Sequence, residues 1–151
     1  MELESFHKDS EHFPTVLFSP ALSVSRLLYG AIVRAIAGYG FTVLTIDHPY
    51  DAGIVEFPDG SLVCGANITT KEQYLMAANT RAQDASFLLD QSSNVEIVKE
   101  IIPGAKTSLN VSQVAMFGHS LGGAATATAM LSDSRNAGGV DMDGTLYGPV
   151  I

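Results

Sequence analysis

The sequence contains little cysteine and little positive charge, and these shortages exclude several classes of protein. Its one cysteine, Cys64, excludes an internal disulfide and a cysteine-based metal site. There are 8 Lys and Arg residues against 16 Asp and Glu, and the basic residues form no cluster, which excludes nucleic acid and anionic membrane surfaces as expected partners. No apolar run approaches the length of a membrane span, so we expect no transmembrane segment.

The charged start over residues 1–13 lacks the apolar segment of a signal peptide and is interpreted as a polar leader. The chain as written is therefore expected in the cytoplasm, with the true compartment left open because we expect the N-terminus to be incomplete. The remaining length and an apolar content of 46% suit a single domain with a sizeable core.

Short apolar runs alternate with helical patterns along this domain. The expected strands cover residues 15–18, 41–46, 114–117 and about 140–147, with a small hairpin around the turn at 57–60. The expected helices cover residues 25–37, 70–91, 95–102 and 121–131, and Gly138-Gly139 is interpreted as a break. This alternation predicts an α/β fold, a mostly parallel sheet with helices on both faces. Ligands bind at the carboxyl ends of the strands in such sheets.

The most informative motif is Gly118-x-Ser120-x-Gly122, between a buried-strand pattern and a helix rich in alanine. This is the spacing of a nucleophile elbow, in which a serine stands on a strained turn and glycines allow the strand and helix to approach. Ser120 is the candidate nucleophile. The oxyanion hole needs two backbone amides, for which we predict Leu121, after the serine, and Leu22, in the loop after the first strand.

A serine nucleophile needs a histidine base and a carboxylate that orients it. His119 adjoins the serine but is expected to point away from it, and His48 is interpreted either as facing the site or as bonded to nearby loop backbone. Asp143 is the candidate orienting acid, because it lies at the end of the next predicted strand. The pattern alone equally allows a turn aspartate before Gly144, and Asp141 alternates with Asp143 on that strand.

These segments together resemble the platelet-activating-factor acetylhydrolase family, in its fungal carboxylic ester hydrolase branch. The matching stretches are residues 18–29, 45–52, 55–60, 81–84, 118–124 and 143–149. The resemblance implies an α/β-hydrolase fold over residues 14–151 and serine-dependent hydrolysis of short-chain carboxylic esters. The sn-2 acetyl ester of phospholipids like platelet-activating factor is one candidate substrate. The resemblance also implies Ser120 as nucleophile and Asp143 as triad acid, with no cofactor and no metal.

The chain departs from the family in two places. Ala21 and Ser23 stand where the family has glycines, and a positive φ at either position would cost about 1 kcal/mol. The family's catalytic histidine follows the acid, and no histidine follows Asp143 here. We therefore expect a partial hydrolase domain, incomplete at both ends, that oligomerises or aggregates through an exposed sheet edge. The alternatives are a non-catalytic α/β-hydrolase-like binding module, an inactive fragment, or an acyltransferase on the same scaffold.

Overall fold

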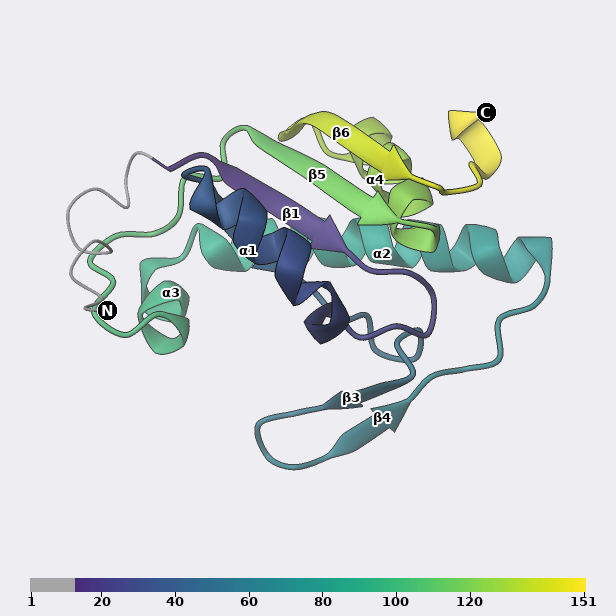
Figure 1. The fold of residues 1–151 in the computed structure, drawn as a ribbon, viewed down its shortest axis with the longest axis horizontal. Coiled ribbons are helices and arrows are strands. Elements are labelled where there is room, and N and C mark those ends of the chain that lie inside the picture. Colours follow the sequence, from purple (N-terminus) through teal and green to yellow (C-terminus); the bar gives the residue numbers. More distant parts are fainter. Residues whose placement is uncertain (1–12) are drawn as a thin grey trace.

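The computed structural model describes residues 13–151 (Figure 1). The polar leader expected over residues 1–13 lies outside the described residues, apart from Phe13. In the described part, four strands form a parallel sheet in the order β2-β1-β5-β6. Their bounds are Thr15–Ser19 for β1, Thr42–Thr45 for β2, Val114–His119 for β5 and Asn136–Met142 for β6. The predicted parallel sheet is confirmed.

Strand β1 lies inside this sheet, with β2 on one side and β5 on the other. All five of its residues are buried, which explains why its sequence is apolar without alternation. Val16 is in register with Val43 of β2 and Ala115 of β5. Because the strands are parallel, the loops after β1, β5 and β6 leave from the same edge of the sheet, where ligands bind in folds of this kind.

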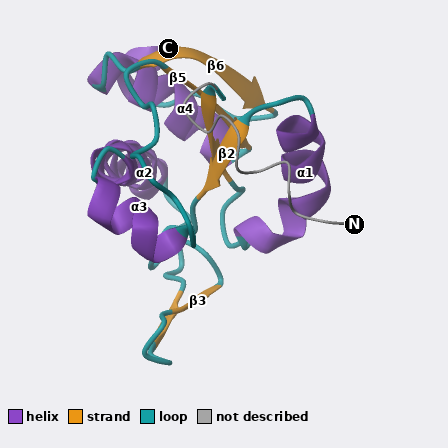
Figure 2. Cartoon of the chain, turned by 90° about the vertical axis from the view of Figure 1, so that its left-hand side faces the viewer, coloured by secondary structure: helices purple, strands orange, loops and turns teal. Residues whose placement is uncertain are grey.

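Helices cover both faces of the sheet, as predicted (Figure 2). Helix α1 (Gly30–Gly38), which follows a 3₁₀ turn at Arg26–Tyr29, covers one face. The other face carries α2 (Lys71–Ser92), α3 (Val95–Ile101) and α4 (Leu121–Ser132), and α4 packs against both α2 and β5. Thr70 and Gln73 form a capping box that begins α2. Across residues 13–151, none of the helices combines the length and the apolar character needed to span a membrane.

The expected hairpin is present as β3 (Ile54–Glu56) and β4 (Leu62–Cys64), which extends away from the parallel sheet (Figure 1). Its turn contains Gly60 with φ of 81°, and Asp59 accepts hydrogen bonds from the backbone amide and hydroxyl of Ser61. The turn residues in the sequence were therefore a sufficient signal for this element.

The prediction for the last strand was wrong in its position. Strand β6 runs from Asn136 to Met142, straight through the glycine pair that was interpreted as a break. Gly139 has a packing role there, because a Cβ at this position would lie 2.5 Å from Cγ2 of Thr126 on α4. The glycine thus allows α4 to lie close to the sheet. Strand β6 is an edge strand in which Val140 is 58% exposed, and association through this edge stays a prediction.

Candidate active site

Ser120 lies at the sharp turn between β5 and α4, where the elbow motif places it. Its backbone has φ of 53° and ψ of −120°, a conformation that non-glycine residues rarely adopt. The turn is held from both sides. The Ser120 amide donates to the Met142 carbonyl at 2.8 Å, and the Ser120 carbonyl accepts from the Gly123 amide at 2.9 Å. A strained serine at a strand-to-helix turn is the geometry that presents its hydroxyl at the edge of the sheet.

Two glycines permit the close contacts around this turn. A Cβ on Gly118 would lie 2.2 Å from the carbonyl carbon of Gly122, and a Cβ on Gly122 would lie 2.1 Å from the carbonyl oxygen of Ser19. Both obstacles are main-chain atoms, so a change of side-chain rotamer cannot remove them. The second contact also shows that the start of α4 lies directly against the end of β1 and the loop that follows it.

That contact brings the two predicted oxyanion amides into one region. Leu121 is the first residue of α4, so its amide is among the N–H groups at the positive end of the helix dipole. Leu22 lies in a turn closed by the Val24 amide and the Ala21 carbonyl at 3.2 Å, a turn that leaves the Leu22 amide unused. The Leu22 side chain packs on the buried cluster that contains Leu121. Their role as an oxyanion hole stays a prediction.

Of the two loop positions at which the family has glycine, only that of Ser23 has a backbone conformation that favours glycine. Among the described residues, Ser23 has a positive φ of 62° and Ala21 does not. Serine in this region costs about 1 kcal/mol or more relative to an ordinary conformation. The Ser23 amide donates to the Asp51 carbonyl at 3.1 Å, which holds the strained residue in place.

The two candidate acids have different surroundings. Strand pairing places Gly118 opposite Asp141, so Asp143 follows at the carboxyl edge of the sheet, where Ser120 follows β5. Asp141 accepts a hydrogen bond from the Gly144 amide at 2.8 Å, the behaviour of a turn aspartate. Asp143 is exposed, and within residues 13–151 its carboxylate has no hydrogen-bond partner. Asp143 is thus the carboxylate available to a histidine, and its triad role stays a prediction.

The two described histidines are both engaged away from Ser120. Nδ1 of His119 is 2.7 Å from the hydroxyl of Tyr29, and the two rings pack with centroids 5.8 Å apart. His119 therefore points away from the nucleophile, as expected. The side chain of His48 is 2% exposed, so it does not face the site, and its ring nitrogens do not bond the loop backbone. Both interpretations of this residue were therefore wrong. Its partners are the side chains of Ser19 and Asp84.

The partners of His48 restrict the directions of the hydrogen bonds in this group. Nδ1 of His48 lies 2.7 Å from Asp84, and Nε2 lies 3.0 Å from the Ser19 hydroxyl. Arg81 donates to the same Ser19 oxygen at 3.1 Å. Arginine only donates and a carboxylate only accepts. Burial lowers the pKa of His48 and so favours its neutral form, for which the arrangement runs from Arg81 to Ser19, from Ser19 to Nε2 of His48, and from Nδ1–H of His48 to Asp84.

Arg81 also binds the loop and the strand end directly. Its side chain is 1% exposed, and its Nε donates to Asp51 at 2.7 Å while Nη2 donates to the other oxygen of that carboxylate. Nη1 donates to the carbonyl of Pro20 as well as to Ser19. Arg26, in contrast, pairs with Asp47 at the start of the 3₁₀ turn.

This network around Arg81 was not predicted from the sequence, although one signal was present. Arg81 follows Ala77 and Ala78 at helical spacing and precedes Ala85, so it lies on the buried alanine stripe of α2. A charged residue on such a stripe is rarely buried without a partner. The identity of the partners could not be inferred, because Ser19 lies 62 residues from Arg81 in the chain.

The burial of His48 leads to a prediction about stability and pH. Burial, which outweighs the hydrogen bond to Asp84, holds the pKa of His48 below its ordinary value of 6.5. The unfolded chain then binds a proton at higher pH than the folded chain does. The contribution of His48 to the free energy of unfolding is therefore complete above about pH 6.5 and falls on acidification, by at most about 1.4 kcal/mol per pH unit.

Urea unfolding between pH 5 and 7 checks this prediction. His48→Asn, which cannot titrate, is expected to flatten the slope of stability against pH, whereas His119→Asn serves as the matched control. An unchanged slope in His48→Asn would show that another group is responsible. The charged groups facing His48 are Asp84, Arg81 and Asp51, so the comparison is made at constant ionic strength.

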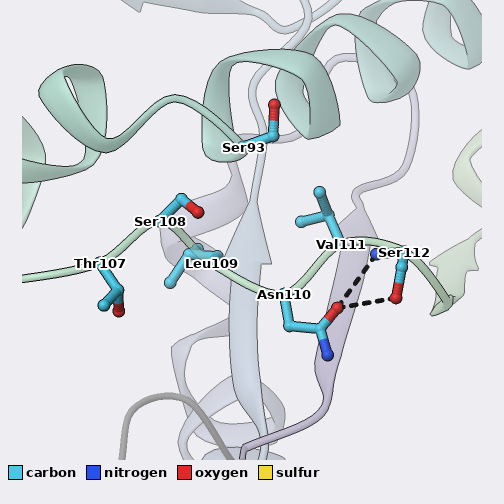
Figure 3. Close-up of a pocket in the computed structure, with 7 residues that line it drawn as sticks. All are labelled: Ser93, Thr107, Ser108, Leu109, Asn110, Val111 and Ser112. Atoms are coloured by element: carbon cyan, nitrogen blue, oxygen red, sulfur yellow. Dashed lines mark hydrogen bonds between the residues drawn. The ribbon is translucent and has the colours of Figure 1, made fainter.

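A hollow of about 620 Å³ lies at the opposite edge of the sheet from Ser120 (Figure 3). It is lined by Ser93 and residues 107–112, where Asn110 accepts from the Ser112 hydroxyl at 2.8 Å. Thr15, at the start of β1, donates to the Asn110 carbonyl, which places the hollow at the amino ends of the strands. The elbow chemistry is therefore not located there. Over residues 13–151, no group of three or more His, Cys, Asp or Glu side chains is arranged to hold a metal ion.

Comparison with known proteins identifies relatives that are named as ester hydrolases of acetylated lipids. The chain is 35% identical over 147 residues to a probable 1-alkyl-2-acetylglycerophosphocholine esterase of Arthroderma benhamiae, which covers 96% of this chain and 35% of the relative. It is 29% identical to the platelet-activating factor acetylhydrolase of Cavia porcellus, over 93% of this chain and 37% of the relative. The chain thus spans a little over a third of the length of these curated relatives.

A solved structure supports the fold assignment. A ferulic acid esterase from Streptomyces cinnamoneus superposes with a TM-score of 0.67 and 28% identity, over 82% of this chain and 34% of the esterase. The family model described as "Platelet-activating factor acetylhydrolase, isoform II" matches residues 2–102, which is more than half of the chain and ends before the elbow. The chain with its buried parallel sheet and its Ser120 elbow belongs to the platelet-activating factor acetylhydrolase, isoform II, family.

Proposed function

We propose that this chain supplies the nucleophile and the oxyanion hole of a serine carboxylic ester hydrolase. The observation that carries the proposal is the conformation of Ser120, a strained residue between a buried strand and the amino end of α4. The elbow lies against the loop that contains Leu22. Backbone strain at a half-buried serine, stabilised by hydrogen bonds on both sides, is expected at a functional residue.

The proposed reaction has two steps. Oγ of Ser120 attacks the acyl carbonyl carbon while its proton passes to a histidine, and the amides of Leu22 and Leu121 bind the resulting oxyanion. The intermediate releases the alcohol, which takes the proton from the histidine, and water then hydrolyses the acyl-enzyme by the same route. Asp143 orients the histidine. The family resemblance assigns this histidine to a position after the acid.

The proposed substrates are short-chain carboxylic esters, including the sn-2 acetyl ester of phospholipids like platelet-activating factor. The names of the Arthroderma and Cavia relatives support this choice, and the ferulic acid esterase supports ester hydrolysis more broadly. The rival is a non-catalytic binding module. It is favoured by one observation, that His48 and His119 are both engaged with other groups.

Labelling with a fluorophosphonate separates the two proposals. The reagent forms an Oγ–P bond with an activated serine, releases fluoride, and leaves the serine proton to the base. We compare the 151-residue chain with a chimera in which it is joined to the part of the Arthroderma relative that follows the aligned segment. We expect rapid labelling of Ser120 in the chimera and much slower labelling of the chain alone.

Ser120→Ala should abolish the label, whereas Ser112→Ala, an exposed serine outside the site, should leave it unchanged. Mass spectrometry of the labelled peptide identifies the residue. Absence of label at Ser120 in both proteins would overturn the hydrolase proposal and support the binding module.

A further inference from the structure

The loop between β1 and the 3₁₀ turn is held at three residues by groups from outside it. The Pro20 carbonyl accepts from Arg81 of α2, the Ala21 amide donates to the hydroxyl of Tyr29 at 3.2 Å, and the Ser23 amide donates to the Asp51 carbonyl at 3.1 Å. The residue enclosed by these contacts is Leu22. The amides of Ala21 and Ser23 on either side of it are both hydrogen-bonded, whereas the Leu22 amide has no protein acceptor within the described residues.

Arg81 is suited to fix the first of these contacts. Its guanidinium is buried, and a buried charge is stable only when it is paired and hydrogen-bonded. Asp51 binds Nε and Nη2, which orients the planar group and directs Nη1 at Pro20 and Ser19. A lysine has a single ammonium on a flexible stem and cannot reproduce this fixed fork.

Tyr29 connects the loop to the elbow itself. Its hydroxyl accepts from the Ala21 amide, so its own proton is free to donate to Nδ1 of His119 at 2.7 Å. His119 immediately precedes Ser120. The Tyr29 ring is held against Phe18 of β1 with centroids 4.7 Å apart. One hydroxyl therefore sets the position of the loop relative to the turn that carries the nucleophile.

We propose that Arg81 and Tyr29 are positioning residues that hold the Leu22 amide beside Ser120 as a preorganised oxyanion donor. This inference rests on the proposed function, since it assigns the machinery that supports the same site. The loop needs such support because Ser23 occupies a left-handed conformation without being glycine. A relaxed Ser23 would rotate the two peptides on either side of it and shift the backbone of Leu22, whose amide the neighbouring contacts must then hold in place. An oxyanion donor contributes to catalysis only where it is already aimed at the developing charge.

Two conservative variants with matched controls test the inference. Tyr29→Phe removes one hydroxyl, and its control is Tyr39→Phe, at a residue that is 85% exposed. Arg81→Lys keeps the charge, and its control is Arg34→Lys, at an exposed position.

Phosphonylation of Ser120 in the chimera gives the maximal rate and the half-saturating reagent concentration separately. We expect a maximal rate lower by about 10-fold to 100-fold in both variants, since loss of a whole oxyanion donor costs about 10²-fold to 10³-fold. The half-saturating concentration should change less than twofold.

Amide hydrogen exchange measured by NMR on the 151-residue chain gives a readout that needs no chemistry at Ser120. Tyr29→Phe is expected to speed exchange at Ala21, whose amide loses its acceptor, by at least tenfold and to leave the core of β5 unchanged, with no such effect in Tyr39→Phe. Unchanged exchange in the loop, or rates equal to those of the controls, would overturn the inference. A change in half-saturating concentration alone would also overturn it, because it would assign these residues to reagent binding.

If Ser120 is not labelled in any protein, the hydrolase proposal fails while the exchange data still decide whether Tyr29 holds the loop. Because Arg81→Lys leaves a buried pair imperfectly matched, Tyr29→Phe decides the question if the lysine variant does not fold.

Discussion

Replacing Gly122 by alanine is expected to lower the free energy of unfolding by more than about 4 kcal/mol, or to prevent folding altogether. The added Cβ would lie 2.1 Å from the carbonyl oxygen of Ser19 and 2.7 Å from that of Pro20. Both atoms belong to the main chain, so relief requires α4 and β1 to separate. Interiors are packed too tightly to absorb such a shift without losing other contacts.

The matched control is Gly38→Ala, at the end of α1, where nothing lies within 4 Å of the added Cβ. Alanine at this helical position is expected to be neutral or to stabilise the chain by up to about 1 kcal/mol. Urea unfolding followed by circular dichroism measures both variants. Equal stability of Gly122→Ala and Gly38→Ala would show that the elbow is looser than the contacts described above.

Replacing Asp143 by asparagine is expected to lower kcat for ester hydrolysis by about 10⁴-fold in the chimera, with little change in KM. Loss of the carboxylate from a serine–histidine–aspartate triad has an effect of this size, because the histidine is then no longer held in the correct tautomer. Asparagine tolerates the positive φ of 61° at this position, so the turn after β6 should persist. Initial rates with a short-chain p-nitrophenyl ester give kcat and KM.

The comparison variant is Asp141→Asn, the same chemical change two residues earlier. Asp141 accepts from the Gly144 amide, and an asparagine oxygen can accept the same bond. Its kcat should therefore stay within about threefold of the unmodified chimera. A loss of activity in Asp141→Asn together with normal activity in Asp143→Asn would exchange the roles of the two carboxylates.

Elements with a local cause were predictable from the sequence. The elbow, the hairpin turn at Gly60 and the start of α2 at Thr70 each depend on the conformational preferences of a few neighbouring residues. The parallel arrangement followed from strands that are apolar throughout, since such strands must be covered on both faces. The last strand was misplaced because Gly139 was interpreted as a chain break, whereas its small size serves the packing of α4 on the sheet.

The residues of the candidate site show the same difference between features with a local cause and features set by tertiary packing. Ser120 and its glycines were identified from their spacing between a strand pattern and a helix pattern, and the collision at Gly118 occurs within one turn of the chain, whereas the collision of Gly122 with Ser19 depends on the packed fold. The position of His119 was predicted, but the partners of His48 were not predictable. His48 bonds Ser19, 29 residues away, and Asp84, 36 residues away, so its neighbours exist only once β1, β2 and α2 have packed together.

The sequence by itself determined the scaffold and the candidate nucleophile, since strand and helix periods and a glycine-bounded serine are local properties. Only the tertiary structure decided that Arg81 is buried and that Tyr29 joins the loop to the elbow. These features depend on partners from separate elements. A buried charge or hydroxyl takes whichever partners the packed fold brings within hydrogen-bond distance, and the pattern of residues around it does not name them.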